Sequence, residues 1–122
     1  MSKSSLENNR VKRAAAVRLL IDGQDSIDKL RIALEPFEFD SEPLAVLRAE
    51  DIIEKISRFL DNQIDQLYLE QWADLIEVRE DIEFERVKEK EIKQVIHDLA
   101  NPVLAGALDE TRARQMTLLL SK

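Results

Sequence analysis

The chain has 122 residues, 25 acidic against 18 basic side chains, one His and no Cys, and a formal net charge of -7. This length suits one domain with a single core. The lack of Cys excludes disulfides, thiol catalysis and cysteine-based zinc sites. No apolar run approaches the ~20 residues that a membrane span needs. Residues 1–13 are polar and basic, unlike a signal peptide, so we expect a cytoplasmic protein.

The composition predicts an all-α fold. Only two Gly and three Pro occur, whereas a β-protein of this size needs more tight turns. Most of the abundant residues are strong helix formers. We expect a flexible basic leader over residues 1–10 and a single helical domain over residues 11–122. The domain should be a compact bundle of five to six helices with mostly antiparallel neighbours, because the later connections are short.

Two helical segments are expected near the N-terminus. Apolar residues recur on one side of residues 11–21, and Gly23 can end or break that helix. Asp25 or Ser26 can cap the next helix. Whether this part forms two helices or one bent helix stays open. The second segment carries a narrow apolar seam that suits packing against one neighbouring helix: Ile27, Leu30, Leu34 and Phe37.

The middle of the chain contains the clearest helical pattern. Pro36 and Pro43 bracket a loop, and residues 49–62 then carry one apolar stripe. Asp65 should cap a further helix over residues 66–80.

The last third begins with an alternation of polar and apolar residues over 81–85. No partner strand is evident, so we interpret it as an extended linker or the tail of the preceding helix. A helix follows over 88–100 and stops before Pro102. Asp109 should cap the last helix.

Charge is unevenly distributed along the sequence. Residues 1–20 carry five bases against one acid, whereas residues 35–85 carry 16 acids against four bases. A solvated acidic rim is one interpretation of this excess, and a surface for a basic partner is the other. A metal site is disfavoured because the calcium-loop spacing is absent. Six acids are the candidate partner-binding residues: Asp74, Glu77, Glu80, Asp81, Glu83 and Glu85.

The sequence offers little for catalysis. His97 is the only histidine, and no nucleophile or second metal ligand stands at a useful spacing from it. We interpret it as a partly exposed boundary residue and expect no enzymatic activity, cofactor or metal. Trp72 and Tyr68 lie on an apolar stripe and should pack in the core. An exposed Trp72 would instead anchor a partner. The basic leader should be solvated or dock on the protein's own acids.

Three stretches of the chain are Trp72-Ala73-Asp74-Leu75-Ile76-Glu77, Arg79-Glu80-Asp81-Ile82 and Leu99-Ala100-Asn101-Pro102. With others they resemble small, mostly uncharacterised bacterial helical proteins and, more distantly, immunity proteins of the colicin D type. The resemblance covers roughly residues 48–120. It implies a non-enzymatic inhibitor whose acidic face plugs the basic site of a toxin.

The sequence therefore favours a protein-binding module of the immunity or antitoxin type that uses an acidic helical face against a basic protein, such as a toxin. The alternative is a structural homodimer joined through the apolar seam. Nucleic-acid binding through residues 10–18 is disfavoured because no aromatic side chain there can stack on bases. No membrane partner is expected.

Overall fold

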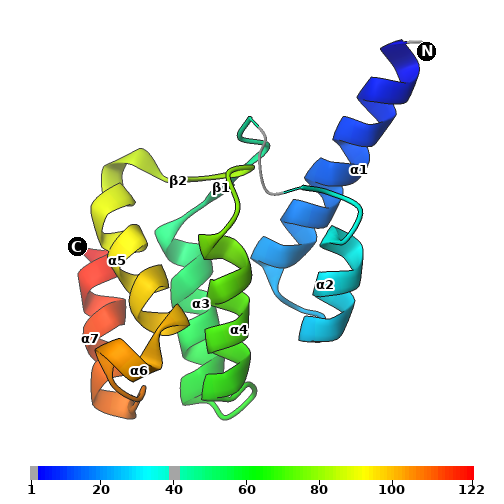
Figure 1. Ribbon diagram of the computed structural model, residues 1–122. Coiled ribbons are helices and arrows are strands. Elements are labelled where there is room, and N and C mark those ends of the chain that lie inside the picture. The colour runs from blue at the N-terminus through cyan, green and yellow to red at the C-terminus, as the bar shows by residue number, and fades with distance from the viewer. Residues whose placement is uncertain (1–2, 39–41) are drawn as a thin grey trace.

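The computed structural model describes residues 3–38 and 42–122, and the protein is mostly helical (Figure 1). The described residues form seven helices, a two-stranded sheet and one 3-10 turn, η1. No helix among them is long and apolar enough to cross a membrane. The helices are α1 Lys3–Asp22, α2 Ile27–Leu34, α3 Ala49–Leu60, α4 Gln66–Glu77, α5 Glu89–Ala100, α6 Pro102–Ala105 and α7 Glu110–Ser121. The remaining elements are β1 Ala45–Leu47, β2 Ile82–Phe84 and η1 Arg86–Lys88.

Side-chain caps fix the start of three helices, as predicted. The hydroxyl of Ser26 accepts from Lys29 N at the start of α2. The carboxylates of Asp65 and Asp109 accept from the third backbone N–H of α4 and α7, at 2.9 and 2.8 Å. Each cap satisfies a backbone donor that has no partner within its helix. The additional helix, α6, arises because Pro102 occupies a first-turn position instead of only ending α5.

The N-terminal part forms two helices. Gly23 has φ +56°, a left-handed conformation that separates α1 from α2. Residues 3–10 form the first turns of α1, and no Gly or Pro interrupts the chain before Gly23. Figure 1 shows these turns projecting away from the other helices. Residues 1–2 lie outside the described residues.

The two short strands form a parallel pair. Ala45 faces Ile82 in the register, and Leu47 faces Phe84. Residues 81–85 were predicted to form a linker or a helix tail, but their central three residues, Ile82–Phe84, form a strand. Parallel strands need a long crossover between them, and here α3 and α4 supply it. The pairing holds the segment after α4 beside the segment before α3.

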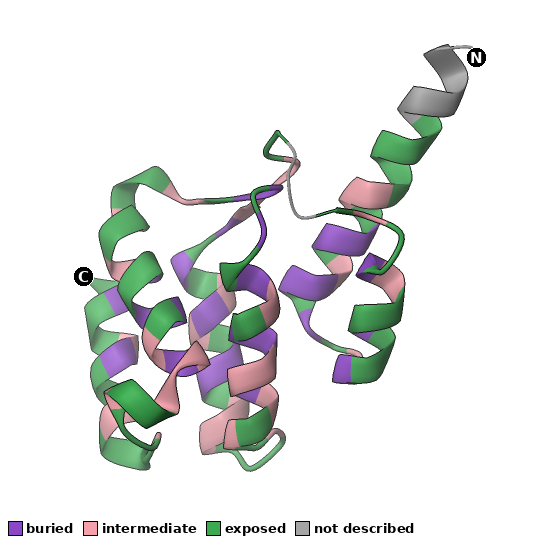
Figure 2. Ribbon diagram, viewed as in Figure 1, coloured by how far each residue is buried: buried purple, intermediate pink, exposed green. Residues whose placement is uncertain are grey.

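The core lies between the helices, where the buried residues of Figure 2 face one another. Helix α4 packs against α5, and α3 packs against α7. In the predicted seam, Ile27, Leu30 and Leu34 are buried within the chain's own core, and Phe37 is partly buried against it. These side chains therefore serve the packing of α2 inside the molecule.

Candidate functional site

The six candidate acids lie on the second half of α4 and on the chain that follows it. Four of them are exposed, one is fully buried and one is half-buried. The exposed residues are Asp74 and Glu77 of α4, Glu80 of the connection and Glu83 of β2. Asp81 is the buried residue and Glu85 the half-buried one.

Asp81 is bound by two arginines of its own chain. Its Oδ1 accepts from Arg79 Nε at 2.9 Å, and its Oδ2 accepts from Arg79 Nη2 and Arg13 Nε, each at 3.0 Å. Asp81 has no exposed surface, and the Arg79 side chain is only 3% exposed. Arg79 Nη2 also donates to the backbone oxygen of Glu38 at 3.2 Å. The expectation that Asp81 contacts a partner is therefore replaced by a structural role: it fixes the α4–β2 connection to α1.

Glu85 also acts within the chain. Its Oε1 accepts from the backbone N–H of Ala49, at the start of α3, at 3.1 Å. An acceptor with negative charge at a helix N-terminus satisfies an otherwise unpaired donor and interacts favourably with the helix dipole. Glu85 thus ties the end of β2 to the start of α3.

Three of the exposed acids have side chains that bind no other described residue of the chain. Asp74, Glu80 and Glu83 form no ion pair or side-chain hydrogen bond with any residue that the structure describes. Glu83 lies between Ile82 and Phe84 in β2, and alternate residues of a strand face opposite sides. Its carboxylate therefore faces away from the core that receives Ile82.

Glu77 forms a cluster with His97 and Asn101 that the sequence analysis missed. His97 Nδ1 lies 2.8 Å from Glu77 Oε2, and Asn101 Nδ2 lies 3.4 Å from Glu77 Oε1. Asn101 Nδ2 also donates to the backbone oxygen of His97 at 2.8 Å. The pair joins α4 to α5 across 20 positions of sequence, so no local spacing could reveal it. A carboxylate on one ring nitrogen orients the imidazole and favours a proton on that nitrogen.

Trp72 lies in the core and is fully buried. Its Nε1 donates to the backbone oxygen of Leu20 at 2.7 Å, which satisfies the one polar atom of the side chain. The core interpretation is confirmed, and the alternative of an exposed anchor is excluded.

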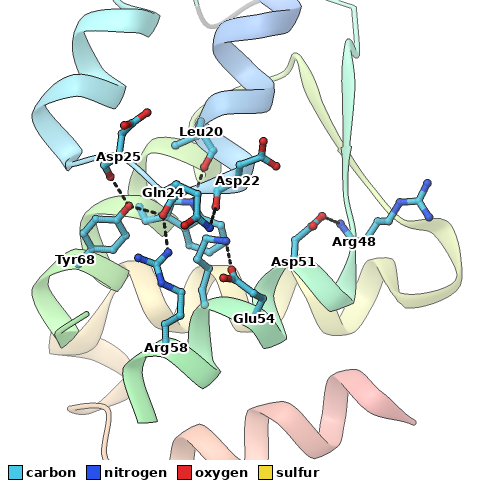
Figure 3. A network of polar contacts seen from close by, with 12 residues as sticks. Leu20, Asp22, Gln24, Asp25, Arg48, Asp51, Glu54, Arg58 and Tyr68 are labelled. Atoms are coloured by element: carbon cyan, nitrogen blue, oxygen red, sulfur yellow. Dashed lines mark hydrogen bonds and ion pairs between the residues drawn. The ribbon is translucent and has the colours of Figure 1, made fainter. Parts of the chain in front are cut away.

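A polar network holds the α1–α2 turn against the bundle (Figure 3). Figure 3 shows Tyr68 of α4 and Arg58 of α3 reaching toward this turn. Tyr68 Oη lies 2.8 Å from Gly23 O and 2.7 Å from Asp25 O, and Arg58 Nη1 donates to Gly23 O at 2.7 Å. Burial raises the pKa of Tyr68 above its usual 10.0, and the nearby positive charge of Arg58 opposes that rise.

Lys55 is the buried member of this network. Its side chain is only 2% exposed, its ammonium pairs with Glu54, and it lies 5.5 Å from the centre of the Trp72 ring. The buried cation is thus neutralised by a carboxylate and by the negative face of the indole. No buried side-chain nitrogen or oxygen among the described residues lacks a hydrogen-bond partner, so this network stabilises the fold.

Two basic residues of α1 contact acids of the same chain. Arg10 pairs with Glu42, and Arg13 pairs with Asp81. Of the two expected arrangements, Arg10 and Arg13 follow docking on the protein's own acids, whereas Lys12 and Arg18 are exposed and form no ion pair with a described residue. Within residues 3–38 and 42–122, no group of three or more potential ligands could hold a metal ion.

Comparisons with protein-family models, curated proteins and solved structures find no match to this chain. The resemblance to immunity proteins of the colicin D type therefore stays a prediction from the sequence.

Proposed function

We propose that this chain is a non-enzymatic protein-binding module, an inhibitor of the immunity or antitoxin type that acts on a basic protein in the bacterial cytoplasm. It would bind through an acidic surface made of Asp74, Glu77, Glu80 and Glu83. The observation that carries the proposal is that Asp74, Glu80 and Glu83 are exposed and unpaired within the described residues. Such carboxylates attract a basic partner over a distance and raise its association rate.

The residues between these acids support the proposal by their structural roles. Asp81 attaches the connection to α1 and to Arg79, and Glu85 attaches the end of β2 to α3. The backbone that carries Glu80 and Glu83 is therefore held at both ends. A prearranged surface loses less conformational entropy on binding than a loose one. We also propose that neighbouring helices of the bundle run antiparallel, because the connections between the later helices are short.

The sequence also suggested a homodimer joined through the apolar seam. Three residues of that seam are buried in the chain's own core and Phe37 is partly buried against it, which leaves little of the seam for a second copy. The acidic surface is therefore the better supported basis for a function.

The test compares three immobilised forms of the protein as baits in lysate of the cells that produce it. One is the natural chain, and one is D74N/E80Q/E83Q. The matched control is E35Q/E50Q/D61N, which removes three exposed acids that have no ion pair in the described structure. Both variants change the net charge by the same amount, so a general charge effect acts on them equally.

We expect the natural chain and the control to retain the same basic protein at low salt and to release it at high salt. The D74N/E80Q/E83Q bait should retain much less of it, since these contacts are electrostatic and salt weakens them. Equal retention by both variants would contradict a role for the acidic surface. Retention that resists high salt on all three baits would contradict the electrostatic mechanism.

A further inference from the structure

A groove runs beside the Glu77–His97 pair, along α5 and the end of β2. Phe84 and Ile96 form its apolar part, and its charged and polar lining residues are Glu77, Lys90, Lys93, Gln94 and His97. Its volume is about 340 Å³, within the ~300–1,000 Å³ range of small-molecule sites. The groove thus combines an apolar floor with a few polar groups, as ligand sites do.

The two lysines are available to a ligand. Both are exposed, and neither forms an ion pair with a residue in the described part of the chain. The spacing of Glu89 and Lys93 suits an i,i+4 pair, yet that pair is not formed. Lys90 and Lys93 are three positions apart on α5, so they lie on the same face of the helix. Together they would attract an anionic group to this side of the groove.

The single carboxylate at the groove is already engaged. Both oxygens of Glu77 have partners, one in His97 Nδ1 and the other in Asn101 Nδ2. Its charge is therefore partly compensated within the protein. The same arrangement leaves Nε2 of His97 without a partner among the described residues, so this ring atom can form a hydrogen bond with a ligand.

We propose that this groove binds a small aromatic carboxylate. The ring would pack on Phe84 and Ile96, where aromatic contact favours a flat apolar body. The carboxylate would lie near Lys90 and Lys93, whose ammonium groups would donate hydrogen bonds to it. Glu77 belongs both to this groove and to the proposed acidic surface. The ligand proposal is tested at Phe84, Lys90 and Lys93, and partner binding at Asp74, Glu80 and Glu83, so each can fail without the other.

The probe is 2-naphthoate, titrated into ¹⁵N-labelled protein up to about 10 mM while amide shifts are followed. We expect saturable shifts that centre on Phe84, Lys90, Lys93 and His97. The neutral isostere 2-naphthylmethanol should bind about tenfold more weakly, because it lacks the charge that the two lysines recognise.

Variants separate the two halves of the site. K90Q/K93Q should weaken 2-naphthoate about tenfold and leave 2-naphthylmethanol unchanged. The matched control K12Q/K29Q removes two exposed lysines elsewhere and should leave both affinities within about twofold of the natural chain. F84L should weaken both probes, and its amide spectrum verifies that it is folded.

Three results would overturn the proposal. One is the absence of saturable shifts at the groove residues. Another is equal binding of 2-naphthoate and 2-naphthylmethanol, which would leave no role for the lysines. The third is an equal loss of 2-naphthoate binding in K90Q/K93Q and in K12Q/K29Q, which would indicate a general charge effect.

Discussion

Replacing Asp81 by Asn tests whether the buried ion cluster holds the α4–β2 connection in place. Asn keeps the shape of the side chain but removes the charge that faces Arg79 and Arg13. Removing one member of a buried ion pair typically costs about 3–5 kcal/mol, because the remaining charge is left uncompensated. Proteins of this size are stable by about 5–15 kcal/mol, so the loss is a large part of the total.

Replacing Arg13 by Gln removes its bonds to Asp81 Oδ2 and to the backbone oxygen of Glu38. It should still cost less than D81N, about 1.5–3 kcal/mol, because it leaves no uncompensated buried carboxylate. Arg79 then keeps both of its bonds to Asp81, and the Arg13 side chain is already 14% exposed to water. The double variant should cost less than the sum of the two single variants, since both remove the same contact.

The assay is urea unfolding followed by circular dichroism. With a slope of about 2 kcal/mol per molar urea, D81N should lower the midpoint by about 2 M. The control is E83Q, two positions along the chain, whose exposed side chain should change stability by less than about 0.5 kcal/mol. A loss below about 1 kcal/mol for D81N would refute the assigned structural role of Asp81.

Three further changes test other contacts. Gly23→Ala should destabilise the protein by about 1–3 kcal/mol in thermal unfolding, because a Cβ there would lie 2.3 Å from Lys55 Cε at φ +56°; an unchanged Tm would contradict this. Since burial raises the pKa of Tyr68 above 10.0, its stabilising effect should be complete below pH 10 and be lost as pH rises through the folded-state pKa. Urea unfolding from about pH 9 to about pH 12 should show this loss in the natural chain and less of it in Y68F; parallel curves would contradict it. Glu85→Ala should cost about 0.5–2 kcal/mol through the lost bond to Ala49 N, and an unaltered urea midpoint would exclude that contribution.

Local signals in the sequence were sufficient to predict most of the helices, although not the short helix α6. Ser26, Asp65 and Asp109 each cap the helix predicted for them, because a cap depends on residues only three positions away. The burial of Trp72 followed from the spacing of the apolar stripe on its helix. Such features need no knowledge of how distant segments meet.

Contacts between distant segments were not predictable in this way. Each strand has only three residues, and β2 finds its partner β1 across two intervening helices. The pairing of Glu77 with His97 likewise depends on how α4 packs against α5.

The burial of two charged residues was also not predictable from hydropathy. Asp81 was grouped with its exposed neighbours because hydropathy assigns a carboxylate to the surface. It is buried because Arg13, which is distant in sequence, compensates its charge together with Arg79. Lys55 is buried in a similar way, between Glu54 and the ring of Trp72. The candidate surface therefore contains fewer acids than the sequence suggested.

The association rate of the captured basic protein tests the central proposal most directly. Stopped-flow mixing would compare the natural chain with D74N/E80Q/E83Q and E35Q/E50Q/D61N across a range of salt concentrations. The proposal predicts that the first variant associates more slowly than the second at low salt. This difference should fade toward 1 M salt, where the screening length falls to about 3 Å. Equal association rates for the two variants at low salt would contradict a function of the acidic surface.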